Sequence, residues 1–226
     1  MRSLTGPDGR GIPDNWISRL EHPSLPPRPP LWPTPPSTPT LLTTPLPSDL
    51  QLNPFLEHRR IGKPPLILDV RMSVQQVFLG EVPPIPEDPV PGIVMFNPEG
   101  PNGAQPATYP GVTALNVTAL ADDPLGEFPW PFIVLNHHAA LPVTVYDVLH
   151  AVIDNFYESV TQEELDALTA SRREQVHRAY WQRVNELPFD EDDGVRRVDY
   201  LGDRYMFRGF EPIPSEEGFM IFFGPP

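Results

Sequence analysis

The chain has 226 residues, no cysteine, 34 prolines and a formal net charge of −14 at neutral pH. The lack of cysteine excludes disulfide frameworks, zinc–thiolate sites and thiol nucleophiles, and it favours an intracellular protein of the cytoplasm or nucleus. The acidic balance, with no basic stripe to offset it, argues against nucleic acid as a partner. The sequence starts without an apolar leader and its apolar runs are too short to span a membrane, so neither secretion nor membrane attachment is expected.

Residues 1–50 are predicted to form a disordered, proline-rich arm. Fourteen prolines lie in the first 60 residues, and each lacks the N–H group that a helix or a central strand needs. The arm contains the pattern P-x-x-P-x-R at Pro23, Pro26 and Arg28, with Pro27 inside it and Trp32 close behind. Such a ridge fits the aromatic groove of a polyproline-binding domain, and a plain spacer accounts for the same composition. The arm is therefore either a recruiting ligand or a spacer.

Residues 51–226 are predicted to form a single α+β domain whose charge differs from that of the arm. From residue 61 onward there are ten basic and 25 acidic residues, whereas the first 60 residues hold six basic and five acidic residues. Runs at 65–71, 113–120 and 132–135 are apolar and strand-like. Residues 81–110 hold nine prolines and are predicted to be a long Pro/Gly-rich surface loop, apart from a strand-like run at 93–96.

Three helices are predicted in succession after these strands. Apolar residues recur at 3-4 spacing from 145 to 160, which is typical of one buried helix face. Each helix begins with a threonine or serine followed three residues later by a carboxylate, which is a capping pattern. The three pairs are Thr144 with Asp147, Thr161 with Glu164, and Ser171 with Glu174. The third helix is expected over 172–187, and its arginines, among them Arg183, are expected at the surface near the acidic run 190–193.

A C-terminal hairpin is predicted from two strand-like runs, 195–201 and 204–210, joined by a two-residue turn. Counting back from that turn places Arg197 opposite Arg208, with Asp199 as the diagonal carboxylate. A last strand is expected at 218–223. The predicted architecture is thus an antiparallel sheet of about five or six strands packed against one long and two shorter helices.

The sequence contains none of the common motifs with a catalytic mechanism. His137 and His138 are the most metal-like pair, but neighbouring strand residues point to opposite faces and cannot share one ion. His150 lies at helical spacing from Asp147 and Asp154, an arrangement that a solvated helix face explains more simply than acid–base chemistry. We therefore predict no metal site, no catalytic residue and no cofactor.

Several blocks of the chain, within about residues 52–223, resemble an uncharacterised family of fungal domains of unknown function that is abundant in mushroom-forming species. The most specific blocks are VTVYDVL at 143–149 and VRRVDYL at 195–201. The others are LNPFL at 52–56, LDVR at 68–71, the dipeptide Pro129-Trp130, and FRG at 207–209. The resemblance implies a shared fold and a fungal origin, and it supplies no activity and no site residues.

The sequence leaves the biochemical function and the oligomeric state open. The leading hypothesis is a non-catalytic interaction or scaffolding module that recruits partners through the proline-rich arm. The alternative is an enzyme of unknown class that uses a polar cluster on the predicted strands, because charged strand residues are costly unless paired or functional. That cluster consists of Asp69, Arg71, Arg197, Asp199 and Arg208. Side chains that line one concave pocket would favour chemistry, whereas pairing across a sheet face would favour architecture. A third reading is a domain without partners, whose arm only adds solubility.

Overall fold

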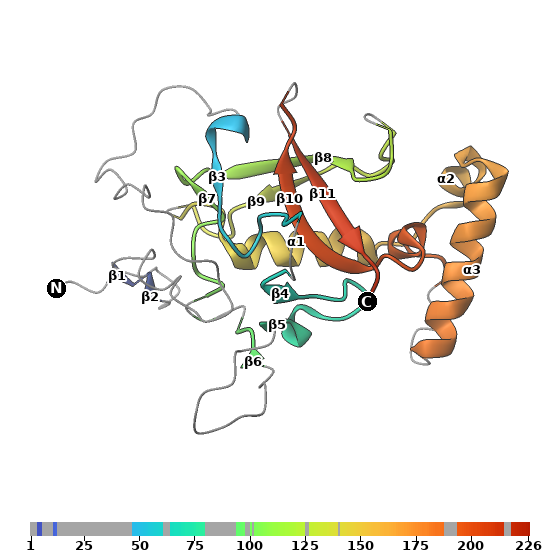
Figure 1. The fold of residues 1–226 in the computed structure, drawn as a ribbon, viewed down its shortest axis with the longest axis horizontal. Helices are drawn as coiled ribbons and strands as arrows, with labels where there is room; N and C mark the ends of the chain where they lie inside the picture. Colours follow the sequence, from blue (N-terminus) through green and yellow to red (C-terminus); the bar gives the residue numbers. More distant parts are fainter. Residues whose placement is uncertain are drawn as a thin grey trace.

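The computed structural model describes most of residues 51–226 and few of residues 1–50 (Figure 1). The described residues are 4–5, 11–12, 47–60, 64–79, 94–97, 100, 102–124, 127–139, 141–187, 194–214 and 218–226. The predicted partner-binding residues of the arm, between 23 and 32, lie outside these ranges. Strand β1 (Leu4–Thr5) pairs antiparallel with β2 (Gly11–Ile12). Among the helices in these ranges, none has the length and apolar character needed to cross a membrane.

The largest sheet has four strands in the order β10-β11-β8-β9. They are β8 (Ala114–Leu120), β9 (Phe132–Leu135), β10 (Met206–Pro212) and β11 (Phe219–Gly224). Strand β11 runs parallel to β8, and the other neighbours are antiparallel. The predicted α+β class is confirmed, but the antiparallel sheet of five or six strands is wrong. The sheet is mixed because the chain crosses over through its helices before it returns beside β8.

The remaining strands are short and form two smaller sheets. One pairs β3 (Gln51–Leu52) with β7 (Thr108–Tyr109), and the other joins β4 (Leu66–Ile67), β5 (Phe78–Leu79) and β6 (Val94–Met95). Two 3-10 turns, η2 (Pro47–Asp49) and η3 (Val74–Gln76), flank them. The strand predicted at 65–71 is only two residues long, because the chain then turns so that Asp69 bridges to Met206 of β10.

Helix α1 (Val145–Tyr157) lies along one face of the four-stranded sheet (Figure 1). Its apolar stripe, which includes Val148, Val152 and Phe156, is buried against inward-facing strand residues such as Leu115 and Val134. The predicted capping box is present, since Thr144 and Asp147 exchange side-chain to backbone hydrogen bonds. Periodicity and cap together therefore placed this helix correctly.

Helices α2 (Gln162–Ala167) and α3 (Ala170–Glu186) stand beside the sheet rather than on it (Figure 1). The capping box of Thr161 and Glu164 is confirmed. The predicted cap of α3 at Ser171 is wrong, because the helix begins two residues earlier and the Thr169 hydroxyl accepts the Arg172 N–H at 3.3 Å. Thr169 and Ser171 offer similar hydroxyl groups, and the exit of the chain from α2 decides between them.

The hairpin predicted between 195–201 and 204–210 does not form. Residues Arg197–Leu201 make a 3-10 helix, η5, and β10 pairs with β11 instead. The turn is stabilised by the Asp199 carboxylate, which accepts the backbone N–H of Arg196 at 2.8 Å, and it ends at Gly202, whose φ of 66° favours glycine. Arg197 therefore does not face Arg208 across a sheet.

The surface loop predicted at 81–110 lies partly outside the described residues, and the described segment 103–108 is buried or half-buried rather than at the surface. Gln105, Ala107 and Thr108 are fully buried. Their backbone is held on two sides, since the Asn53 N–H donates to Ala107 O and the Ala107 N–H donates to Val143 O. Prolines in this stretch flank β7 without interrupting it, so its proline content concealed a buried segment.

One edge of the four-stranded sheet is covered by other parts of the chain. Glu57 bridges to Phe210 of β10, and the backbone groups of Leu56 and His58 bond Phe210 on both sides. This close approach requires Gly209, whose φ is 112° and where a Cβ would lie 2.6 Å from the His58 nitrogen. The β10 edge is therefore closed by residues 56–58 and, further along, by 68–70.

The two hydroxyl groups near the start of α3 give a matched test of the fold. We expect Thr169→Ala to lower the free energy of unfolding by about 1 kcal/mol, because it removes the N-cap acceptor. Ser171→Ala should leave stability unchanged or slightly raised, because alanine is the better helix former. Urea denaturation of both variants measures this, and a larger loss for Ser171→Ala would contradict the observed helix start.

Candidate functional site

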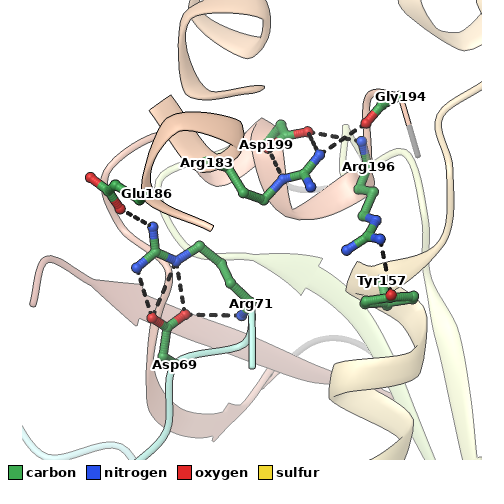
Figure 2. A network of polar contacts seen from close by, with 8 residues as sticks. All are labelled: Asp69, Arg71, Tyr157, Arg183, Glu186, Gly194, Arg196 and Asp199. Carbon is green, nitrogen blue, oxygen red and sulfur yellow. Dashed lines mark hydrogen bonds and ion pairs between the residues drawn. The ribbon is translucent and has the colours of Figure 1, made fainter. Parts of the chain in front are cut away.

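Asp69 and Arg71, two members of the predicted polar cluster, bind each other at the end of the β4 segment (Figure 2). The Arg71 guanidinium donates from Nε to Asp69 Oδ1 at 3.0 Å and from Nη2 to Oδ2 at 2.8 Å. Its Nη1 donates to Glu186 Oε2 of α3 at 2.6 Å, and its plane lies 3.4 Å from the centre of the Tyr205 ring. Burial lowers the pKa of Arg71, but its hydrogen bonds to the Asp69 and Glu186 carboxylates outweigh burial, and the net pKa is raised.

Asp199 lies in a second, more deeply buried pair with Arg183 of α3 (Figure 2). Arg183 is only 2 % exposed and donates to both Asp199 oxygens, at 2.8 and 2.9 Å. The same guanidinium donates to the Gly194 carbonyl at 2.9 Å. This fork geometry satisfies a buried charge, which is costly without partners. The expectation that Arg183 is a surface residue is therefore wrong.

Arg197 belongs to a third group, formed with helices α1 and α2. Its guanidinium donates to Asn155 Oδ1 at 2.8 Å and pairs with Glu158 at 2.8 Å. It also lies 5.4 Å from the centre of the Trp130 ring, and the Trp130 indole donates to Glu164 at 2.6 Å. This group ties the start of α2 to the end of α1.

Arg208, the last predicted member, stands apart from the other four. It lies at the bulge in β10 and donates to the Pro225 carbonyl near the end of the chain. Helix α3 contacts both pairs, since Arg183 binds Asp199 and Glu186 binds Arg71, as Figure 2 shows. The predicted cluster is therefore divided into separate contacts, and it does not line one pocket.

Arg183 could have been found from the sequence. It lies at the spacings of the inward stripe of α3, seven residues after Val176 and four after Ala179, both of which are buried. An arginine on the buried stripe of a helix needs a partner for its charge, unless the helix ends before it and leaves the side chain in solvent. Glu186 gave no such signal, because it lies at the exposed end of the helix and its partner Arg71 is 115 residues away.

Of the histidines and carboxylates weighed for metal binding or acid–base chemistry, His137 and Asp147 hold the start of α1 in place. His137 Nδ1 lies 2.7 Å from Asp147 Oδ1, and Asp147 also accepts hydrogen bonds from the Thr144 backbone and hydroxyl. Asp147 is therefore turned toward the helix start and not toward His150, so the acid–base trio with Asp154, which the sequence disfavours, does not form. In the described part of the chain, no group of three or more His, Asp or Glu residues could hold a metal ion.

A small cavity lies between the sheet and α1, and it offers no polar group for chemistry. Its walls come from β3 and the residues after it, from all four strands of the main sheet and from α1, and they are apolar throughout. They are formed by Leu52, Leu56, Leu115, Val117, Val134, Val148, Phe210 and Phe219. The cavity is a feature of the core rather than a substrate site.

The buried pair of Arg183 gives a test of its structural role. We expect Arg183→Met to lower the free energy of unfolding by about 3–5 kcal/mol, because Asp199 would be left buried without its partner. Arg178→Met on the same helix should change it by about 0.3–0.5 kcal/mol, since its exposed pair with Glu174 is weak. Urea denaturation measures both values. If Arg183→Met fails to fold, the double variant with Asp199→Asn should recover folding, and an unchanged stability for Arg183→Met would refute the role.

Glu164 gives a pH-dependent test. The Thr161 backbone N–H is the main cause that lowers the pKa of Glu164, burial opposes it, and the Trp130 indole lowers it further. A lowered folded-state pKa contributes stability that is present above the unfolded pKa, about 4.3, and is lost as the pH falls through the folded value. We expect Glu164→Gln to be less stable than the wild type at neutral pH, with a difference that shrinks below about pH 4.5. Glu163→Gln, on the same helical turn and exposed, serves as control, and a pH-independent difference would contradict the assignment.

Comparison with known proteins places the chain in one family. Residues 66–218 match a family of unknown function, DUF6699, and this range includes Asp69, Arg71, Arg183, Arg197 and Asp199. No curated protein and no solved structure matches the chain. The matched range covers more than half of the chain and lies within the range predicted from the sequence blocks. The chain therefore belongs to DUF6699, a family of unknown function.

Proposed function

We propose that the chain is a non-catalytic interaction module, in which the proline-rich arm at 1–50 recruits partners to the single domain at 51–226. The observation that carries the proposal is the internal pairing of the polar cluster. Asp69 pairs with Arg71, and Asp199 pairs with Arg183, at two different places in the fold. Charged residues that neutralise each other in separate pairs support a structural role for the cluster more than a catalytic one.

The alternative of an enzyme has less support. General acid–base catalysis needs a group that exchanges protons near neutral pH. Hydrogen bonds from Gln182 and Arg71 lower the pKa of Glu186, and hydrogen bonds from Arg60 and His58 lower that of Glu211. These carboxylates stay ionised at neutral pH and act as fixed partners of arginine.

The arm supplies the recruiting element of the proposal. Pro23, Pro26 and Arg28 present two proline ridges and a cation in the order that an aromatic groove with an acidic pocket binds. The charge balance supports this class of partner. Residues 51–226 carry 12 basic and 26 acidic residues, a net charge of −14, while the arm at 1–50 carries four of each, a net charge of zero. An acidic groove is therefore repelled by the domain but not by the arm, where Arg28 supplies the local positive charge.

Titration of the full chain with SH3-type domains tests the recruiting arm. We expect backbone amide NMR signals between residues 23 and 32 to shift on addition of the binding SH3 domain, while signals of α1 and β8 stay in place. Arg28→Ala should weaken the interaction by about 10-fold or more, because the arginine supplies the charged contact.

Pro45→Ala provides the matched control, because it removes an arm proline outside the motif and should leave the affinity unchanged. Equal loss in both variants would show that the arm binds without regard to the motif. If no member of a diverse panel of polyproline-binding domains shifts the signals between 23 and 32, the recruiting arm is excluded.

A further inference from the structure

Strand β9 carries two of the most exposed large apolar side chains in the described part of the chain. Ile133 is 60 % exposed and Leu135 is 64 % exposed, while Val134 between them is buried in the core. Because successive strand residues alternate between faces, Ile133 and Leu135 lie together on the outer face of the sheet. They form a small apolar patch at the outermost strand.

This edge of the sheet is open, in contrast to the edge at β10. Strand β9 is the last strand in the order, and in the described ranges no further strand or bridge pairs with it. It also lacks the charges that protect edge strands from pairing. Residues 128–146 contain no Asp, Glu, Lys or Arg, in a chain whose net charge is −14. A second copy can therefore approach here without bringing carboxylates together at the strand.

The backbone groups of the two exposed residues point toward the open side. The Asn136 N–H donates to the Thr113 carbonyl of the neighbouring chain segment, so residue 136 faces β8. The pairing of Val134 with Leu115 and of Phe132 with Val117 continues that alternation. Ile133 and Leu135 therefore direct their N–H and C=O groups away from β8, where another strand could bind them.

We propose that β9 is a self-association edge, at which a second copy of this chain pairs antiparallel and extends the sheet across a twofold axis at Val134. In this register Ile133 lies opposite Leu135 of the second copy, and the two residues exchange both backbone hydrogen bonds. The same arrangement brings the exposed apolar side chains together on the outer face. Backbone and side-chain complementarity thus select one register.

Neighbouring registers are excluded by residues at the two ends of β9. A register centred on Ile133 would place Leu135 opposite Pro131, which has no N–H to donate. A register centred on Leu135 would place Ile133 opposite His137, whose backbone N–H already donates to Asp147. Of the three registers, the one centred on Val134 pairs both Ile133 and Leu135 with residues that can exchange backbone hydrogen bonds.

The strand is four residues long, so the interface is small and the dimer is expected to be weak. Sedimentation velocity of the full chain from about 5 to about 500 µM should show monomer giving way to dimer. Leu135→Lys should lower the association constant about 10-fold or more, since a charge on the edge opposes pairing. Trp181→Lys on α3 is the matched control, because Trp181 is also 60 % exposed, and it should leave association unchanged.

The register itself can be tested because the chain has no cysteine. Directly opposed residues lie about 5.5 Å apart between Cα atoms, within the disulfide range. A mixture of Ile133→Cys and Leu135→Cys chains should form mixed disulfides faster than either variant forms disulfides with itself. Faster self-coupling of either variant would overturn the register.

A chain that stays monomeric across the whole concentration range would overturn the proposal. So would dimerisation that Leu135→Lys leaves unchanged, because another surface would then be responsible. Protection of β9 amides by an added strand peptide in a monomeric chain would assign the edge to a different partner and would also overturn it. None of these outcomes depends on the arm, so they are distinct from a failure of the proposed recruiting function.

Discussion

The buried pair of Arg183 and Asp199 is the interaction on which the helical half of the molecule depends. One carboxylate accepts the guanidinium fork from α3 and the backbone N–H that starts η5, so it fixes a helix and a turn together. The turn then directs Arg196 to the Tyr157 hydroxyl and Arg197 to Asn155, both on α1. Because the charges are desolvated, loss of either partner leaves a buried ion without its counter-charge. The resulting loss of stability affects α3, η5 and α1 together.

Arginine has a second role in this fold, as a flat group that stacks on aromatic rings. Arg71 lies over Tyr205, Arg172 over Tyr200, Arg196 over Tyr157 and Arg197 near Trp130. Arg71, Arg172 and Arg197 also pair with a carboxylate, from Asp69, Asp123 and Glu158. A guanidinium can do both at once, whereas an ammonium group offers neither the plane nor the fork. This gives a physical reason for a chain in which Lys63 is the single lysine.

The two edges of the four-stranded sheet differ, because the β10 edge is covered by other backbone segments and the β9 edge is open in the described part of the chain. Residues 56–58 and 68–70 close the β10 edge through backbone hydrogen bonds, and Gly209 makes that approach sterically feasible. The β9 edge has apolar side chains and outward-facing backbone groups instead. A weak dimer through β9 would present two arms, and two arms raise the effective concentration of a bivalent partner without any new contact.

The sequence by itself determined the elements that local rules control. The 3-4 spacing and the Thr144 cap determined α1, and apolar, β-branched runs determined β8 and β9, because these signals act within one element. Tertiary structure decided the rest. Val198, Tyr200 and Leu201 gave the run 195–201 a strand-like character, yet Asp199 lies in a 3-10 turn because Arg183, on helix α3, supplies its partner. Likewise Gln105 and Ala107 are buried in a proline-rich stretch because Asn53 and Val143 bind their backbone or side chains. The five residues of the polar cluster separated into different contacts for the same reason. Each charged side chain binds the partner that folding brings close to it, and no local sequence pattern predicts which residues become neighbours in space.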